Sequence, residues 1–161
     1  MTVKEYNACV DQHADAVYRF IVKNLRDEEK SRDVVQEAFT RMWEKAGDID
    51  GRKAKSYLFT SAYHIMIDTI RKDGRQTGME EVHENHHYTT RHYSDLKQVL
   101  NDALLRLPEV QRSVIMLRDY EGYSYDEIGQ ICGLNESQVK VYIYRGRVAL
   151  KKYIVSMENL V

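Results

Sequence analysis

The sequence predicts an all-α protein of two small helical domains joined by a flexible linker, with a helix-turn-helix as the C-terminal domain. Apolar residues recur at helical spacing through most of the chain, and residues 76–94 lack such a pattern. One proline and 8 glycines are too few for the many tight turns of an all-β chain. We therefore expect domains at residues 1–75 and 95–161, with the linker at residues 76–94.

Composition sets the outer bounds on class and location. The chain has 161 residues, a formal net charge of −1, 43% hydrophobic and 30% charged residues, which suits compact folded domains. No apolar run reaches membrane-spanning length, and Met1 leads into polar residues rather than a signal peptide, so we expect a cytoplasmic protein without membrane insertion. Cys9 and Cys132 lie far apart on apolar helix faces and are expected to be buried thiols.

The first two helices are predicted at residues 2–25 and from residue 33 to residue 45, separated by a polar break in which Asp27 is a plausible N-cap. Outside the apolar face of the second helix lies a polar row at spacings of three and four. Such a row is typical of a solvated face, or of a surface whose carboxylates meet basic groups on a partner helix. The row consists of Asp33, Gln36, Glu37 and Arg41.

A basic loop and a third helix come next. Residues 47–55 are rich in turn formers, and Ser56 is expected to cap a helix that runs to about residue 72. Residues 52–75 hold six Lys or Arg against two Asp, together with Tyr57, Phe59 and Tyr63. Cations for the backbone and rings for stacking are the mixture used on single-stranded bases, although aromatics at helical spacing are also typical of a core.

The predicted linker contains three glutamates and four histidines without sustained periodicity. His83 and His87 would have zinc-compatible spacing on a helix, but no helix is evident there and no cysteine is close. We therefore favour a flexible, mildly acidic linker over a metal site.

The helix-turn-helix is predicted between Ser124 and Tyr153, after helices at residues 94–107 and 109–120 separated by Pro108. Capping boxes begin both of its helices, with Ser124 paired to Glu127 and Asn135 to Gln138, and Gly133 occupies the left-handed position between them.

The second helix of this motif is basic on its outer face. Val139, Ile143 and Leu150 form its inner face, and no acidic residue occurs from Ser137 to Met157. A DNA major groove lined by phosphates requires such a face, although an ordinary helical hairpin with a solvated basic face is the alternative. The outer residues are Lys140, Tyr144, Arg145, Arg147, Lys151 and Lys152.

Motifs for catalysis are not found in the sequence. It contains no dinucleotide-binding GxGxxG, Walker loop, HExxH or nucleophile elbow. We therefore expect neither an enzyme nor a bound cofactor.

Three segments resemble the extracytoplasmic-function (ECF) sigma factors of bacterial RNA polymerase. LRLPEVQRSVIMLRDYEGYSYDEIGQICGLNESQVKVYIYRGRVALKKY is similar to their minus-thirty-five-binding domain, and DVVQEAFTRMWEK is similar to the helix that docks on the clamp coiled coil of the polymerase beta-prime subunit. SYLFTSAYHIMIDTIRKDGR resembles the helix that melts and reads the minus-ten element. The order, the spacing and nearly the whole length agree.

The resemblance implies a role for each segment. Core RNA polymerase, including its beta flap, promoter DNA as duplex and melted strand, and an anti-sigma factor are the implied partners. Polymerase docking falls to the polar row, Asp33, Gln36, Glu37 and Arg41. The minus-ten set is Lys53, Lys55, Tyr57, Tyr63, His64 and Arg71. The minus-thirty-five set is Gln138, Lys140, Val141, Tyr144, Arg145, Arg147 and Lys151.

Four positions depart from the family pattern. Tyr57 occupies a position where the family usually has Trp, and His64 one where it usually has Asn. Both differences change the expected minus-ten base preference. Tyr142 stands for a customary Arg, and Gly146 for Ala at a helix-propensity cost of about 1 kcal/mol.

The alternative from another class is an autonomous homodimeric helix-turn-helix repressor or activator. It predicts a dimer in a mass measurement, whereas a sigma factor is a monomer or is bound to a partner. An enzyme with a metal in the histidine-rich segment is the third alternative.

Overall fold

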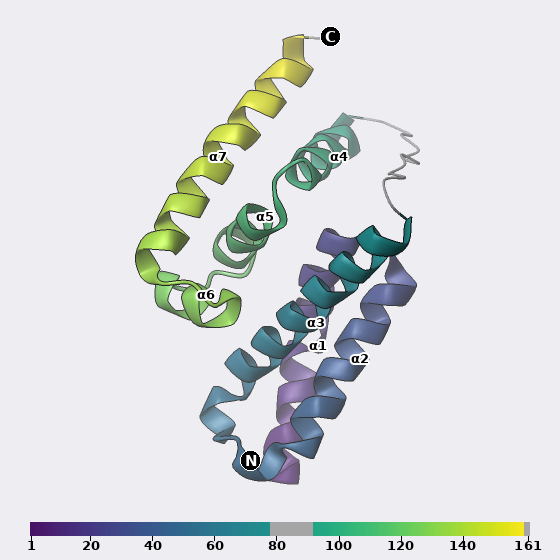
Figure 1. The fold of residues 1–161 in the computed structure, drawn as a ribbon, viewed down its shortest axis with the longest axis vertical. Helices are drawn as coiled ribbons and strands as arrows, with labels where there is room; N and C mark the ends of the chain where they lie inside the picture. Colours follow the sequence, from purple (N-terminus) through teal and green to yellow (C-terminus); the bar gives the residue numbers. More distant parts are fainter. Residues whose placement is uncertain (78–91, 160–161) are drawn as a thin grey trace.

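The computed structural model describes residues 1–77 and 92–159, and every regular element in those ranges is helical (Figure 1), which confirms the predicted all-α class. None of these helices is long and apolar enough to cross a membrane. Short 3-10 helices η1 (Ala46–Asp48) and η2 (Gly51–Lys53) and a π-helical turn η3 (Met116–Tyr120) connect the main elements. The α-helices are α1 (Val3–Leu25), α2 (Glu28–Glu44), α3 (Ala54–Thr77), α4 (His92–Leu105), α5 (Glu109–Ile115), α6 (Tyr125–Cys132) and α7 (Glu136–Asn159).

Helices α1, α2 and α3 pack against one another as an N-terminal bundle. Local hydrogen bonds fix its boundaries. Thr2 forms a capping box with Glu5, Arg26 ends α1 with a left-handed φ of 56°, and the Asp27 side chain accepts from the backbone N–H of Lys30 as predicted. The core of the bundle consists of fully buried apolar side chains, including Val17, Phe20, Ile21, Ala38, Met42, Leu58, Phe59 and Met66.

Helix α3 begins earlier than predicted, so the expectation that Ser56 is its N-cap is wrong. The Asp50 side chain accepts from the backbone N–H of Arg52 and starts η2, which continues directly into α3 at Ala54. Ser56 therefore lies inside the helix.

Helices α6 and α7 form the predicted helix-turn-helix. Ser124 and Glu127 exchange the two capping-box hydrogen bonds at 3.1 and 2.9 Å, and Gly133 has a left-handed φ of 73°. Asn135 and Gln138 exchange the same pair of bonds at 2.8 and 2.9 Å. These local bonds hold α7 at a fixed angle to α6.

Helix α5 is shorter than predicted, because the chain leaves α-helical geometry after Ile115. In η3 the backbone N–H of Glu121 donates to the Met116 carbonyl, and that of Tyr123 donates to the Leu117 carbonyl. The wide turn brings Tyr123 inward, where its side chain is only 2% exposed.

The two halves of the chain pack together rather than standing apart. Helix α3 contacts α6, and α1 contacts α5. In Figure 1, α6 lies beside α3, and α7 lies on the far side of α5 and α6 from the N-terminal bundle. We call this contact zone between the N-terminal bundle and the region from α5 through η3 to α6 the seam.

Gly146 provides a test of the packing between α7 and α5. A Cβ at position 146 would overlap Ile115 Cδ1 and lie 3.3 Å from its Cγ1, while Ile115 is only 2% exposed. Alanine gains about 1 kcal/mol of helix propensity, but overpacking costs about 1–3 kcal/mol. We expect Gly146→Ala to lower the free energy of unfolding by about 1 kcal/mol in urea titrations.

Ile115→Val removes the Cδ1 atom and supplies the control. In that background Gly146→Ala should raise the free energy of unfolding by up to about 1 kcal/mol, because the propensity gain is no longer opposed by a clash. If Gly146→Ala destabilised the protein equally in both backgrounds, a clash with Ile115 would not be the cause.

Candidate nucleic-acid and partner interfaces

The polar row on α2 is exposed over its whole length. Asp33, Gln36, Glu37 and Arg41 all face solvent, and a guanidinium nitrogen of Arg41 lies 2.5 Å from a carboxylate oxygen of Glu37. This pair is about half exposed on both sides, so it contributes only about 0.3–0.5 kcal/mol to the helix. The row is therefore available to a partner.

Trp43 extends this surface and was not among the sequence predictions. It lies seven residues after Gln36 on the same face of α2 and is 50% exposed. Tyr6 supports the indole from behind, with ring centroids 5.0 Å apart in an edge-to-face arrangement. An exposed, buttressed Trp beside charged groups is typical of an interface anchor. Its i+7 spacing from Gln36 was the available sequence signal.

The predicted minus-ten residues divide into accessible and covered groups. Lys53, His64 and Arg71 are exposed, and Tyr57 is half-buried at the edge of the core. These four side chains lie on η2 and α3 and leave a basic surface open to solvent.

Tyr63, by contrast, is covered in the seam, whereas Lys55 stays exposed at its border. Tyr63 is 5% exposed and lies against the Cys132 thiol of α6, and burial raises the pKa of its hydroxyl. Lys55 Nζ lies 4.5 Å from the ring centroid of Tyr123. In this arrangement a DNA base does not reach Tyr63.

The cations of α7 also divide into two groups. Arg147 makes two hydrogen bonds to Asp119, at 2.5 and 3.3 Å, and Lys140 Nζ lies 3.3 Å from a carboxylate oxygen of Glu136. The Gln138 side chain caps its own helix through Asn135. These three predicted DNA contacts are thus already engaged within the chain.

Arg145 differs, because it forms no ion pair with any residue in the described ranges. It borders a shallow hollow with Asn135, Val141 and Tyr142. Its guanidinium is therefore free to bind a ligand, and it forms no ion pair with either acid of α6, Asp126 or Glu127.

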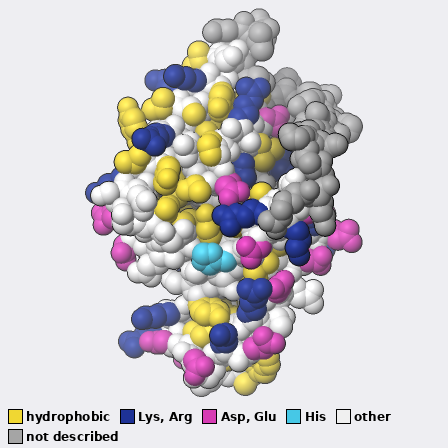
Figure 2. Space-filling model, in the orientation of Figure 1, with side chains coloured by type: hydrophobic (Ala, Val, Ile, Leu, Met, Phe, Trp, Pro, Cys, Tyr) yellow, Lys and Arg dark blue, Asp and Glu magenta, His cyan; other side chains and the backbone are white. Residues whose placement is uncertain are grey.

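Apolar side chains are interspersed among these cations. Val141, Tyr144 and Val148 are 42%, 70% and 39% exposed on the outer side of α7. Figure 2 shows Lys and Arg side chains intermingled with hydrophobic ones over α7. A helix that offers both a guanidinium and apolar groups suits base edges, which carry hydrogen-bond acceptors and the thymine methyl group.

The histidine pair considered for zinc, His83 and His87, lies outside the described residues. Among residues 1–77 and 92–159, no cluster of three or more His, Cys, Asp or Glu side chains is arranged to hold a metal ion.

Comparison with known families matches both halves of the chain. Residues 9–76 match the family described as Sigma-70 region 2, and residues 97–150 match Sigma-70, region 4. The two regions together cover about three quarters of the sequence, in the order in which the two interfaces occur.

Curated relatives agree with these matches. The chain is 28% identical over 158 residues to the ECF RNA polymerase sigma factor SigE of Mycolicibacterium smegmatis, covering 92% of this chain and 61% of that protein, so it spans less than two thirds of that relative. It is 26% identical over 156 residues to SigM of Bacillus subtilis, covering 94% of both.

A solved structure has the same fold. The sigma factor RpoE of Bartonella quintana, solved in complex with the anti-sigma factor NepR, superimposes with a TM-score of 0.77 at 25% identity, covering 94% of this chain and 98% of that one. The likeness extends over both halves of the chain.

Proposed function

The chain belongs to the family of extracytoplasmic-function sigma factors, and from this premise we propose that it binds core RNA polymerase and directs it to promoters. The observation that carries the proposal is the combination of two separate surfaces, the exposed row on α2 and the basic, acid-free outer face of α7. The mechanism is non-catalytic: the protein positions the polymerase and traps unpaired bases as the duplex opens.

Docking on the polymerase falls to α2. Asp33, Gln36 and Glu37 offer carboxylate and amide groups to basic side chains on the beta-prime clamp coiled coil, and Trp43 offers apolar area at the end of the row. Arg41 keeps the Glu37 carboxylate oriented along the helix. The beta flap would receive the C-terminal domain.

Promoter DNA would be read at two places. The accessible cations on η2 and α3, Lys53 and Arg71, hold the backbone of the melted minus-ten strand, with Tyr57 and His64 beside its bases. The outer face of α7 enters the major groove at the minus-thirty-five element, where Arg145 offers a planar fork to a guanine.

The proposed setting is the cytoplasm, with an anti-sigma factor as a further partner. A structurally similar sigma factor was solved with such a protein bound, which supports this assignment. A homodimeric repressor is disfavoured, because it has no use for a docking surface on α2.

Run-off transcription with purified core polymerase tests the proposal directly. The wild-type protein should direct specific transcripts from genomic promoter fragments. Gln36→Ala with Glu37→Ala should lower core affinity by about 30-fold or more, since loss of a buried interfacial charge pair costs about 2–5 kcal/mol. The melting temperature should stay close to that of the wild type, because both side chains are exposed.

The matched control is Asp11→Ala with Gln12→Ala, which removes the same kinds of exposed side chain from α1. Core affinity should not change in this variant. Normal core binding by the α2 variant would refute the docking surface, and the absence of any promoter-specific transcript with the wild-type protein would refute the function.

Base reading by α7 gives a second prediction. Arg145→Ala should cost about 1–3 kcal/mol and relax base preference at one or two adjacent minus-thirty-five positions, because a bidentate contact to guanine is lost. Lys151→Ala should weaken all sequences evenly and lower the salt dependence by about one unit, as for a phosphate contact. Transcription from a randomised minus-thirty-five library measures both effects.

Thermal unfolding of the two variants is the control. Arg145 has no ion pair in the described part of the chain, so its replacement should leave the melting temperature within about 1–2 °C of the wild type. A lowered melting temperature together with an unchanged base preference would show that Arg145 is structural.

A further inference from the structure

Two polar side chains meet in the interior of the seam. Asn24 on α1 is 5% exposed and Arg112 on α5 is 8% exposed. Asn24 Oδ1 accepts a hydrogen bond from Arg112 Nε at 2.8 Å, and Asn24 Nδ2 donates to the Phe20 carbonyl and to Met116 Sδ. Arg112 Nη1 donates to the Leu107 carbonyl at 3.2 Å. The Asn24 side chain thus bonds to residues in both halves of the protein.

The charge of Arg112 is buried without a counter-ion. No carboxylate in the described ranges forms an ion pair with it, and burial lowers the pKa of its guanidinium although Glu109 acts in the opposite direction. A buried cation that is bound only by neutral acceptors recovers only part of the hydration free energy that it loses on leaving water. The free energy that favours the closed arrangement is therefore smaller than it would be for an apolar seam of the same area.

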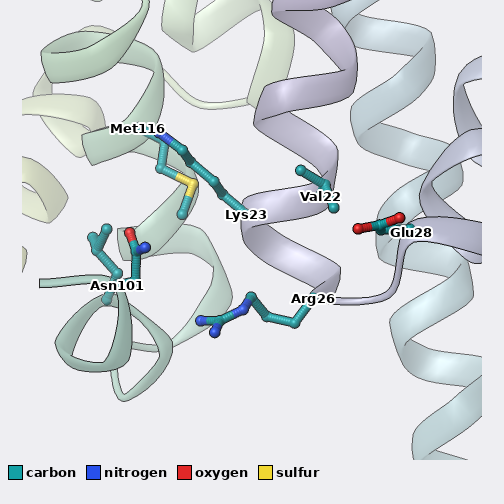
Figure 3. Close-up of a pocket in the computed structure, with 7 residues that line it drawn as sticks. Val22, Lys23, Arg26, Glu28, Asn101 and Met116 are labelled. Carbon is teal, nitrogen blue, oxygen red and sulfur yellow. The ribbon is translucent and has the colours of Figure 1, made fainter. Parts of the chain in front are cut away.

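Contacts around this pair complete the seam. Arg19 makes two hydrogen bonds to Glu121, at 2.9 and 3.2 Å, and the Glu121 side chain is only 7% exposed. Phe59 and Tyr123 stack edge to face with centroids 5.2 Å apart. These contacts are flanked by an open groove of about 240 Å³ between the end of α1 and α4 (Figure 3). The two halves thus make specific contacts but leave a groove between them, as expected of surfaces that separate.

The closed arrangement is incompatible with the proposed reading of two promoter elements at once. The minus-ten and minus-thirty-five elements are about 25 base pairs apart, which is about 85 Å of B-form DNA. Helix α7 has 24 residues and is about 36 Å long, and the helix-turn-helix to which it belongs is in contact with α3 through α6. The seam also covers Tyr63.

We propose that the free protein stays in this closed arrangement as long as the buried Arg112 keeps its Asn24 partner, and that loss of this contact lets the two halves separate and uncovers α3. The contact acts as an intramolecular latch that restrains the chain without any partner. This inference rests on the proposed function, because it assigns regulation to the same two DNA-reading surfaces.

Cys132 offers a chemical readout of opening. Its thiol lies in the seam against Tyr63, and burial raises its pKa to about 12. Opening returns the thiol to water, where a pKa near 8.5 gives far more thiolate at neutral pH. The rate of Cys132 alkylation by iodoacetamide, followed by peptide mass spectrometry, therefore reports the open fraction.

Two changes at the latch should have different effects on the alkylation rate. Asn24→Ala leaves Arg112 buried without its side-chain acceptor, and alkylation of Cys132 should become about 10-fold faster. Asn24→Leu combined with Arg112→Met replaces the polar pair by apolar side chains of similar size, and alkylation should be no faster than in the wild type. Asn7→Ala, at an exposed site on the same helix, is the matched control and should change nothing.

Equal alkylation rates in the wild type and Asn24→Ala, with both variants fully helical, would overturn the latch. So would equal acceleration in Asn24→Ala and the double variant. Neither measurement uses polymerase or DNA. Failure of the proposed function appears separately, as the absence of promoter-specific transcription with the wild-type protein.

Discussion

The packing of α6 between α3 and α7 is the constraint on which the other surfaces depend. Helix α6 has only eight residues, and its apolar side chains Ile128 and Ile131 are fully buried. Because one side of this short helix rests on α3 and another on α7, the position of the helix-turn-helix is fixed as long as the seam is closed. The outer face of α7 points away from the N-terminal bundle, and part of α3 is covered.

This arrangement explains why the residues suited to binding are not equally available. The row on α2 is exposed and takes no part in the seam, so the proposed docking on a polymerase would require no rearrangement. On α7, Asp119 holds Arg147 and leaves Arg145 free, which separates a structural cation from one that can read a base. Tyr63 is different again, since it is buried in the seam next to α6. Availability therefore follows from packing as much as from chemistry.

Sequence reasoning succeeded where the determining contacts are local. Asp27, Ser124 and Asn135 cap helices through hydrogen bonds to residues three positions away, so the residue types alone predict them. The prediction that Ser56 caps α3 was wrong because Asp50 starts η2, which continues into α3, before that residue. The Asn24–Arg112 contact joins residues 88 positions apart, and neither residue type indicates burial. The assignment of surfaces to polymerase and DNA came from the resemblance to a family, since spacing alone left solvated faces as an alternative.

The most direct test of this account is the distance between the two halves of the chain, measured with labels at Glu44→Cys on α2 and Ser156→Cys on α7, both exposed sites. We expect one short distance distribution for the free protein, and a longer one, by tens of ångströms, in the complex with core polymerase and promoter DNA. A free protein that is already extended, or a transcriptionally active complex that keeps the short distance, would contradict it.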